Sequence, residues 1–189
     1  MVSREKISGE QIETMLDTCS SEARIQIAES KEVFIGDIMV LGIDFTIDVP
    51  YQSVLSINDI LQIDDGKIQF QIIGVEPFVL KSLTHGKLKN GAGVYSPKLS
   101  INLPFLSEKG KEDINSAFSK NLDWIACSFV KTKEDVDEIR RMKQNYPECR
   151  TKIMAKIETV EAVQNLEEII SVSDGIMIAR RDLAVAFPI

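Results

Sequence analysis

The stretch Lys152-Ile-Met-Ala-Lys-Ile-Glu158 decides the fold, because it joins a short apolar run to charges at its carboxyl end. A second stretch, Ile176-Met-Ile-Ala-Arg-Arg-Asp182, repeats this arrangement. Apolar runs of this length without helical spacing are typical of buried parallel strands. Along the first strand Met154, Lys156 and Glu158 share one parity, so we expect their side chains to project from the same face.

Lys156 and Glu158 are unusual residues for the end of a buried strand. Burying them costs free energy unless they meet partners, a metal or a ligand. Asp182 could complete a pair of carboxylates with Glu158, and two carboxylates beside a lysine suit a hard cation together with an anionic substrate. The spacing alone leaves an alternative open, in which Lys156 and Glu158 form an internal ion pair without a functional role.

The composition is that of a soluble globular protein of one domain or two small ones, with 189 residues, 44% hydrophobic and 27% charged. A net charge of −7 argues against nucleic acid as the default partner. No apolar run is long enough to span a bilayer, and residues 1–11 lack the core of a signal peptide. The three cysteines have no metal-ligand spacing, which predicts reduced thiols and a cytoplasmic location.

Changes in residue pattern predict three segments: an N-terminal arm over 1–21, a β-rich domain over 22–100 and a strand–helix region over 101–189. In the arm, Ser8 suits a helix N-cap, and three apolar residues follow at helical spacing: Ile12, Met15 and Leu16. We therefore expect a short surface helix there, with no chemistry.

The second segment alternates apolar and polar residues with period two, as in Asp44-Phe-Thr-Ile-Asp-Val49 and Lys67-Ile-Gln-Phe-Gln-Ile72. This pattern predicts strands with one buried face. Asp64-Asp65-Gly66 is a strong hairpin signal, because glycine accepts the positive φ that such turns require. Pro104 suits a hinge after this segment. We expect an independent β-domain.

The third segment predicts strands and helices in alternation. Strands are expected at 122–130, 152–158 and 175–180, with helices after Ser107, after Thr132 and across 162–170. This order indicates parallel βα units, whose ligands bind beyond the carboxyl ends of the strands. The candidate residues share that position: Ser128, Lys156, Glu158 and Asp182. Their common place favours a functional site over an isolated ion pair.

Four stretches resemble successive motifs of the pyruvate kinase family: Leu106-Ser-Glu-Lys-Gly-Lys-Glu-Asp-Ile114, Asp123-Trp-Ile-Ala-Cys-Ser-Phe-Val130, the Lys152–Glu158 stretch and Ser173-Asp-Gly-Ile-Met-Ile-Ala-Arg-Arg-Asp-Leu183. Their order and spacing also resemble the family. Asp59-Ile-Leu-Gln-Ile-Asp-Asp-Gly66 is similar to part of its lid domain, and Ile101-Asn-Leu-Pro104 to the return into its barrel. The resemblance extends from about residue 24 to 189.

The resemblance implies an α/β fold, a partial (β/α)8 TIM-barrel segment with a small β-barrel lid domain. It implies phosphoryl transfer from phosphoenolpyruvate to ADP, with Mg²⁺ or Mn²⁺ and with K⁺. Lys156 matches the catalytic lysine, and the carboxylates of Glu158 and Asp182 match the metal ligands. The resemblance gives a substrate-binding role to four residues: Ser128, Ala179, Arg181 and Asp182. A lysine beside a carboxylate-bound metal suits this reaction, which needs positioning and charge neutralisation.

Three positions depart from the family pattern. Arg181 stands where the family has a glycine whose backbone N–H meets the substrate carboxylate. If that glycine is left-handed, the arginine costs about 1–2 kcal/mol. Ala184 replaces another family glycine, and Ala186 replaces a family glutamate. The matched stretches supply three barrel strands, without the family's substrate arginine, most potassium ligands or late-strand threonine.

Three functions remain open from the sequence. The chain is a pyruvate kinase polypeptide with impaired activity, a non-catalytic relative that acts as a binding or assembly module, or a metal-dependent enzyme acting on pyruvate or its enolate. Because a partial barrel exposes sheet edges, we expect a homo-oligomer or a partner chain to cover them. We expect neither a nucleic acid nor a membrane as partner.

Overall fold

The computed structural model describes residues 12–18 and 21–187. The chain divides into two compact units, Met1–Ser21 with Pro104–Leu183, and Glu22–Leu103 with Ala184–Ile189. Each unit has a hydrophobic core of its own. Within the described ranges, no helix has both the length and the apolar character needed to cross a bilayer.

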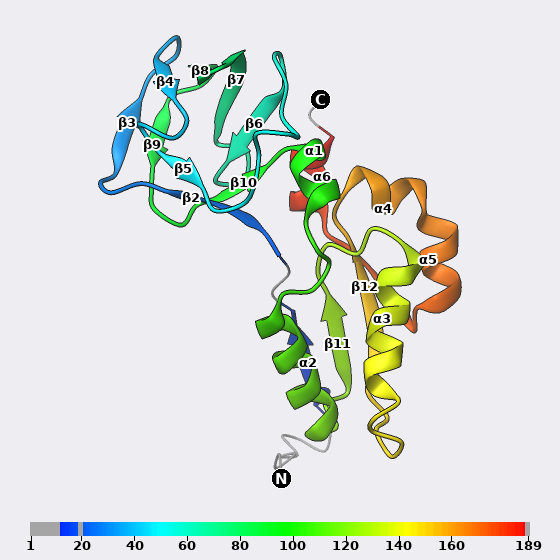
Figure 1. The fold of residues 1–189 in the computed structure, drawn as a ribbon. Helices are drawn as coiled ribbons and strands as arrows, with labels where there is room; N and C mark the ends of the chain where they lie inside the picture. The colour runs from blue at the N-terminus through cyan, green and yellow to red at the C-terminus, as the bar shows by residue number, and fades with distance from the viewer. Residues whose placement is uncertain (1–11, 19–20, 188–189) are drawn as a thin grey trace. The chain divides into compact units, whose positions relative to one another are not determined.

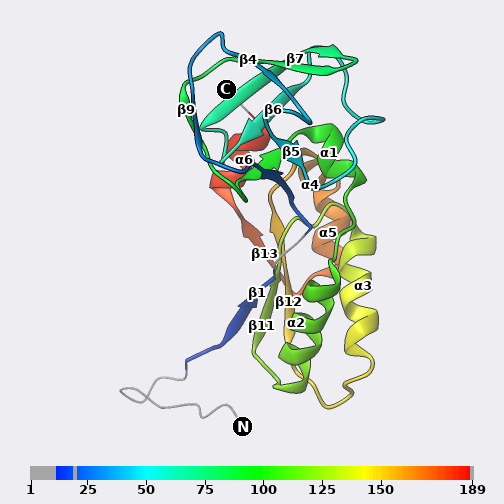
Figure 2. The ribbon, with the colours of Figure 1, turned by 60° about the vertical axis from the view of Figure 1, so that its left-hand side comes forward.

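The first unit contains a four-stranded parallel sheet in the order β1-β11-β12-β13. Its strands are β1 (Met15–Asp17), β11 (Trp124–Cys127), β12 (Lys152–Ile157) and β13 (Gly175–Ile178). All three pairings are parallel, so the carboxyl ends of the four strands lie at one edge. Figure 1 shows β11 and β12 side by side, and Figure 2 shows β1 and β13 with them.

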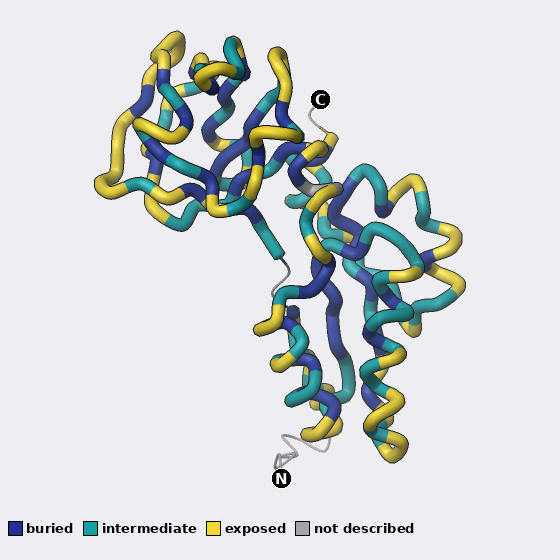
Figure 3. The backbone as a smooth tube through the Cα atoms, in the orientation of Figure 1, coloured by how far each residue is buried: buried dark blue, intermediate teal, exposed yellow. Residues whose placement is uncertain are grey.

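Helices cover one face of this sheet. They are α2 (Glu108–Ser119), α3 (Lys133–Lys143), α4 (Val160–Gln164) and α5 (Leu166–Val172), and α6 (Arg180–Ala186) follows β13. Figure 2 shows α2, α3 and α5 together on the same side of the strands. Alternate residues of β12 face these helices and are fully buried or nearly so: Ile153, Ala155 and Ile157. The neighbouring strand β11 is also largely buried, as the dark blue colour of the tube in Figure 3 shows.

Local sequence explains where the helices begin. The Ser107 hydroxyl accepts a hydrogen bond from the Gly110 N–H at 3.0 Å and caps α2. Asp135 accepts one from the Thr132 N–H at 2.9 Å at the start of α3. The predicted helix across 162–170 is interrupted at Asn165, and the chain forms two short helices there, α4 and α5.

The second unit is built from antiparallel strands in the order β4-β8-β7-β6-β10-β2-β5, with β3 paired to β9. Its elements are β2 (Ala23–Gln26), β3 (Lys31–Val33), β4 (Ile38–Val40), β5 (Thr46–Ile47), β6 (Ile60–Ile63), β7 (Ile68–Val75), β8 (Phe78–Ser82), β9 (Gly86–Leu88), β10 (Gly93–Tyr95) and α1 (Pro97–Asn102). The sheet curls around its own core as a half-barrel (Figure 1).

The predicted hairpin in the second unit is confirmed. β6 pairs with β7 in a register that brings Ile63 opposite Ile68, across Asp64-Asp65-Gly66. All three turn residues have positive φ angles, of 53°, 56° and 77°. Aspartate and glycine tolerate this region better than most residues, which explains their use in the turn. The predicted fold class, α/β with a partial barrel and a small lid, is also confirmed. Independent folding of the β-rich segment stays a prediction.

The helix predicted in the N-terminal arm is wrong for the residues that the structure describes. Met15–Asp17 is strand β1, parallel to β11, with Met15 opposite Trp124 and Asp17 opposite Ala126. The proposed cap, Ser8, lies outside the described residues. Three apolar residues cannot distinguish the two periods, and pairing with β11 supplies the hydrogen bonds that decide for a strand. The sheet therefore has four strands, where three were expected.

Candidate active site

Lys156 stands at the centre of a polar cluster near the carboxyl ends of β1, β11 and β12. Its Nζ lies 3.0 Å from Asp17 Oδ1, 2.9 Å from Ser128 Oγ and 3.0 Å from Glu158 Oε1. A lysine ammonium has three hydrogens, and each finds an oxygen acceptor from a different segment. Only 12% of the Lys156 side chain is exposed, so the cation is held in a defined position.

Sheet geometry brings these residues together. Parallel strands end at the same edge, and Asp17 ends β1 while Ser128 directly follows β11. Lys156 and Glu158 share one parity at the end of β12, as the sequence predicted. The structure thus places Lys156 in contact with both Ser128 and Glu158.

Glu158 is buried at the base of the cluster, with 3% of its side chain exposed. Its Oε2 accepts a hydrogen bond from the Phe129 N–H at 2.6 Å. Burial raises the pKa of Glu158 above its ordinary value, and the Phe129 N–H and the Lys156 ammonium oppose this shift. The negative charge of Asp182 adds to the increase in this pKa. Glu158 would therefore gain from a further positive charge nearby.

Lys156 keeps its proton in this setting. Burial lowers the pKa of Lys156, but the hydrogen bonds and charges of Glu158 and Asp17 outweigh burial, so the pKa lies above its ordinary value. The ammonium is therefore a fixed positive charge at neutral pH, suited to binding an anion rather than to acting as a general base.

Asp17 and Thr18 belong to this cluster, and sequence reasoning missed both. Asp17 accepts hydrogen bonds from Lys156 and from the Ser128 hydroxyl, the latter at 3.1 Å. The Thr18 hydroxyl accepts one from the Ser128 N–H at 3.0 Å. The only signal available was a two-residue apolar step, Met15-Leu16, before a polar Asp17-Thr18 pair, and that step fits a helix equally well.

The remaining predicted residues lie around the start of α6. Ala179 precedes the helix, and its N–H donates to the Ile157 carbonyl at 3.2 Å. Arg181 and Asp182 lie in the first turn of α6, where Arg181 is exposed and Asp182 half-buried. Asp182 reaches the cluster through its charge, which acts on Glu158. The roles given to these three residues stay predictions.

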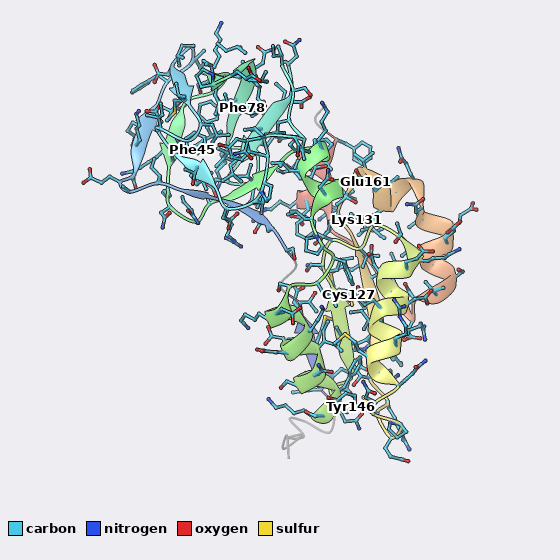
Figure 4. All side chains as sticks on the ribbon, viewed as in Figure 1. Phe45, Phe78, Cys127, Lys131, Tyr146 and Glu161 are labelled. Atoms are coloured by element: carbon cyan, nitrogen blue, oxygen red, sulfur yellow. The ribbon has the colours of Figure 1, made fainter. Side chains whose placement is uncertain are left out.

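Other reactive groups near this edge are poor candidates for chemistry. Cys127 is fully buried on β11, and burial raises its pKa to about 12, which disfavours the nucleophilic thiolate. Lys131 and Glu161, both labelled in Figure 4, are neighbours in the segments that follow β11 and β12. Burial lowers the pKa of Lys131, while the charges of Asp135 and Glu161 raise it. The carboxylates of Asp135 and Glu161 therefore act on Lys131 through their charge.

The predicted metal ligands offer a partial coordination set. The described residues contain no group of three or more His, Cys, Asp or Glu side chains able to hold a metal ion. Glu158 and Asp182 offer hard carboxylate oxygens, and Mg²⁺ commonly uses one or two carboxylates with waters and substrate phosphates. Burial of Glu158 beside a second carboxylate also fits a cation. These two residues could hold a divalent ion that completes its shell with water and substrate.

Comparison with known proteins gives consistent matches. The family model described as pyruvate kinase, barrel domain, matches residues 2–189. The pyruvate kinase of Geobacillus stearothermophilus is 35% identical, over 97% of this chain and 34% of its own length. Those of Sporosarcina psychrophila (35%, 99% and 34%) and Bacillus licheniformis (33%, 95% and 33%) are similar. The chain spans about a third of the length of these relatives. The chain therefore belongs to the pyruvate kinase family, within the barrel domain.

Proposed function

We propose that this chain carries the lysine-centred part of a site that transfers a phosphoryl group from phosphoenolpyruvate to ADP, giving pyruvate and ATP in glycolysis. One observation carries the proposal: the largely enclosed Lys156 ammonium is held at the carboxyl ends of parallel strands by three oxygens. Ligands of such sheets bind at this edge. Phosphoryl transfer depends mainly on positioning and charge neutralisation, which a fixed cation supplies.

The cluster already contains an exchangeable contact for a phosphoryl oxygen. Glu158 is almost fully buried, whereas 64% of the Asp17 side chain is exposed. In the proposed role, a phosphoryl oxygen takes the place of Asp17 beside Lys156, while Glu158 and Ser128 keep the ammonium in position. The cation then meets its substrate without leaving the sheet.

Glu158 and Asp182 are the proposed ligands of Mg²⁺ or Mn²⁺. When bound, the ion would neutralise charge on phosphoryl oxygens and on the buried Glu158. Ser128, Ala179 and Arg181 are proposed substrate contacts by family resemblance, and K⁺ is proposed beside Ser128 on the same ground. By the same resemblance, the backbone N–H of Arg181 is the proposed contact for the substrate carboxylate.

A non-catalytic binding module is the second candidate. The sheet face opposite the helices carries Met15, which is 45% exposed, and Met154, which is half-buried. Parallel sheets are normally covered on both faces. We therefore propose a second copy or a partner chain on this face and its edges, a cytoplasmic location, and neither nucleic acid nor membrane as partner.

The proposed function is tested by calorimetric titration of the chain with phosphoenolpyruvate, with and without Mg²⁺. We expect binding that needs Mg²⁺ and that weakens at least about tenfold in Lys156→Met, because a hydrogen bond to a charged group contributes about 1.5–3 kcal/mol. Lys133→Met is the matched control, since Lys133 pairs with Glu168 on the helices. Equal affinity in Lys156→Met and wild type would exclude the proposed role.

A further inference from the structure

The opposite end of the same sheet contains a recess of about 290 Å³. Asn121, Trp124, Arg150 and Lys152 line it, together with the carboxylates Glu13 and Asp123. Trp124 and Lys152 are the first residues of β11 and β12, so the recess lies at the amino ends of the strands (Figure 1). Lys152 is four residues from Lys156 along β12, which corresponds to about 13 Å. The recess is therefore separate from the Lys156 cluster.

Three hydrogen-bond donors in the recess lack an acceptor among the residues that the structure describes. Within residues 12–18 and 21–187, the Arg150 guanidinium, the Lys152 ammonium and the Asn121 side-chain amide meet no acceptor oxygen. Asn121 Oδ1 already accepts a hydrogen bond from the Arg150 N–H at 2.9 Å, which leaves the amide nitrogen as the group available to a ligand. Together they offer two positive charges and several N–H groups.

The two carboxylates in the recess are already engaged. Glu13 Oε2 accepts a hydrogen bond from Trp124 Nε1 at 2.9 Å. Asp123 Oδ2 accepts bonds from Thr14, from its N–H at 2.8 Å and its hydroxyl at 2.9 Å. The formal charges of the recess balance, so net charge does not select a ligand. The surplus of hydrogen-bond donors selects the ligand instead, and it favours a group rich in acceptor oxygens.

Trp124 forms a fixed wall for this recess. Glu13 holds the indole N–H, and Lys152 Nζ lies 4.9 Å from the ring centroid, within cation–π range. A Cβ added at Gly175 would lie 3.2 Å from Trp124 Cζ3, so the glycine makes room for the ring. The aromatic wall and the nearby cations are thus arranged before any ligand arrives.

We propose that this recess binds a small anion through phosphate or carboxylate oxygens, which accept hydrogen bonds from Arg150, Lys152 and Asn121 beside Trp124. A guanidinium suits both groups, because its N–H fork matches two oxygens at once. The site does not depend on the phosphoryl-transfer proposal.

Trp124 is the only tryptophan of the chain, so its fluorescence reports on the recess directly. The full chain is titrated with inorganic phosphate, and in a second arm with succinate, against sodium chloride at matched ionic strength. We expect a saturable change with at least one of the two anions and none with chloride. The tighter of the two identifies the preferred oxygen group.

Substitutions then place the anion. Arg150→Gln and Lys152→Gln are each expected to raise Kd about tenfold, whereas Lys133→Gln, on the helical face, leaves Kd unchanged. Lys156→Met is also expected to leave it unchanged, and loss of the signal in that variant would place the anion at the other end of the sheet. Arg150→Lys replaces Arg150→Gln as the test if the glutamine variant does not fold. It keeps the positive charge and loses only the bidentate guanidinium contact, so Kd should still rise.

Two further results overturn the site. One is a fluorescence change that rises linearly and equally with phosphate, succinate and chloride. The other is saturable binding with the same Kd in the wild type and in folded variants of both Arg150 and Lys152. Far-UV circular dichroism establishes which variants are folded.

Discussion

At the scale of single residues, Lys156 is distinguished by two carboxylate partners, Asp17 and Glu158, around one ammonium. Glu158 is buried and Asp17 is exposed, so the two carboxylates differ in what their removal would do. In the proposed function, the buried partner fixes the position of the cation, and the exposed one is exchanged for substrate.

Asp17→Asn is expected to lower the pKa of Lys156 towards its ordinary value of 10.5, because the Asp17 charge contributes to the increase. NMR titration of the Lys156 side chain measures this change. Asp113→Asn, which removes a partner of the surface residue Lys109, serves as the control and should leave Lys156 unaffected. An unchanged pKa in Asp17→Asn would show that Asp17 does not support the cation.

Glu158 should make stability depend on pH in a defined direction. Its folded-state pKa is raised above the ordinary value of 4.5, so the native state binds more protons than the unfolded state between these values. Stability from this group is fully present below 4.5 and is lost as pH rises through the folded pKa. Urea unfolding of the wild type and of Glu158→Gln between about pH 4 and 8 measures this pH dependence of the free energy of unfolding.

Relative to Glu158→Gln, the wild type should lose free energy of unfolding as pH rises through this window. The variant lacks the titrating carboxyl. Its loss of the charged contact with Lys156 changes its free energy of unfolding by an amount that does not depend on pH in this window. A difference that grows in favour of the wild type with rising pH would contradict the assignment of a raised pKa.

At the scale of elements, β12 is the strand on which the first unit depends. It pairs with β11 and with β13 and buries Ile153 completely. Ile153→Ala should destabilise this unit by about 2–5 kcal/mol, because it removes buried methyl groups and leaves a cavity. Ile170→Ala on α5 is the matched control, since Ile170 is 51% exposed and should change stability little. Unfolding followed by Trp124 fluorescence measures both, and equal effects would contradict this account of the core.

The sequence predicted long periodic elements and missed short ones. The order from β11 to β13 was predictable, because apolar runs and capped helical stripes alternate over residues 107–180. The Lys156–Glu158 contact was predictable from parity. Strand β1 was not, because three residues carry no period and their pairing partner β11 begins more than 100 residues later. Asp17 was missed with it, since its role depends on that pairing.

At the scale of the whole molecule, the proposed function assigns one part of a reaction site to this chain. The chain spans about a third of the length of its relatives. By the family resemblance, the matched stretches supply no counterpart of the substrate arginine, most potassium ligands or the late-strand threonine. Losing one preorganised charge stabiliser costs about 2.7–4 kcal/mol in catalysis. We therefore expect turnover of phosphoenolpyruvate and ADP well below about 1 s⁻¹, an ordinary enzyme rate.

A lactate dehydrogenase-coupled assay with Mg²⁺ and K⁺ measures this turnover. Arg181→Gly should raise any residual activity if the exposed arginine obstructs the substrate, and lower it if the arginine binds the substrate. Rates at or above about 1 s⁻¹ for the wild-type chain would show that the residues present are sufficient.

The central claim is that Lys156 meets the phosphoryl group, and NMR of its side chain tests this most directly. The Lys156 signal is assigned by its absence in Lys156→Arg and followed as phosphoenolpyruvate is added with Mg²⁺. The account predicts a saturable shift of this signal with the same Kd as calorimetry, while the Lys133 signal stays in place. Binding by calorimetry with no change in the Lys156 signal would contradict it.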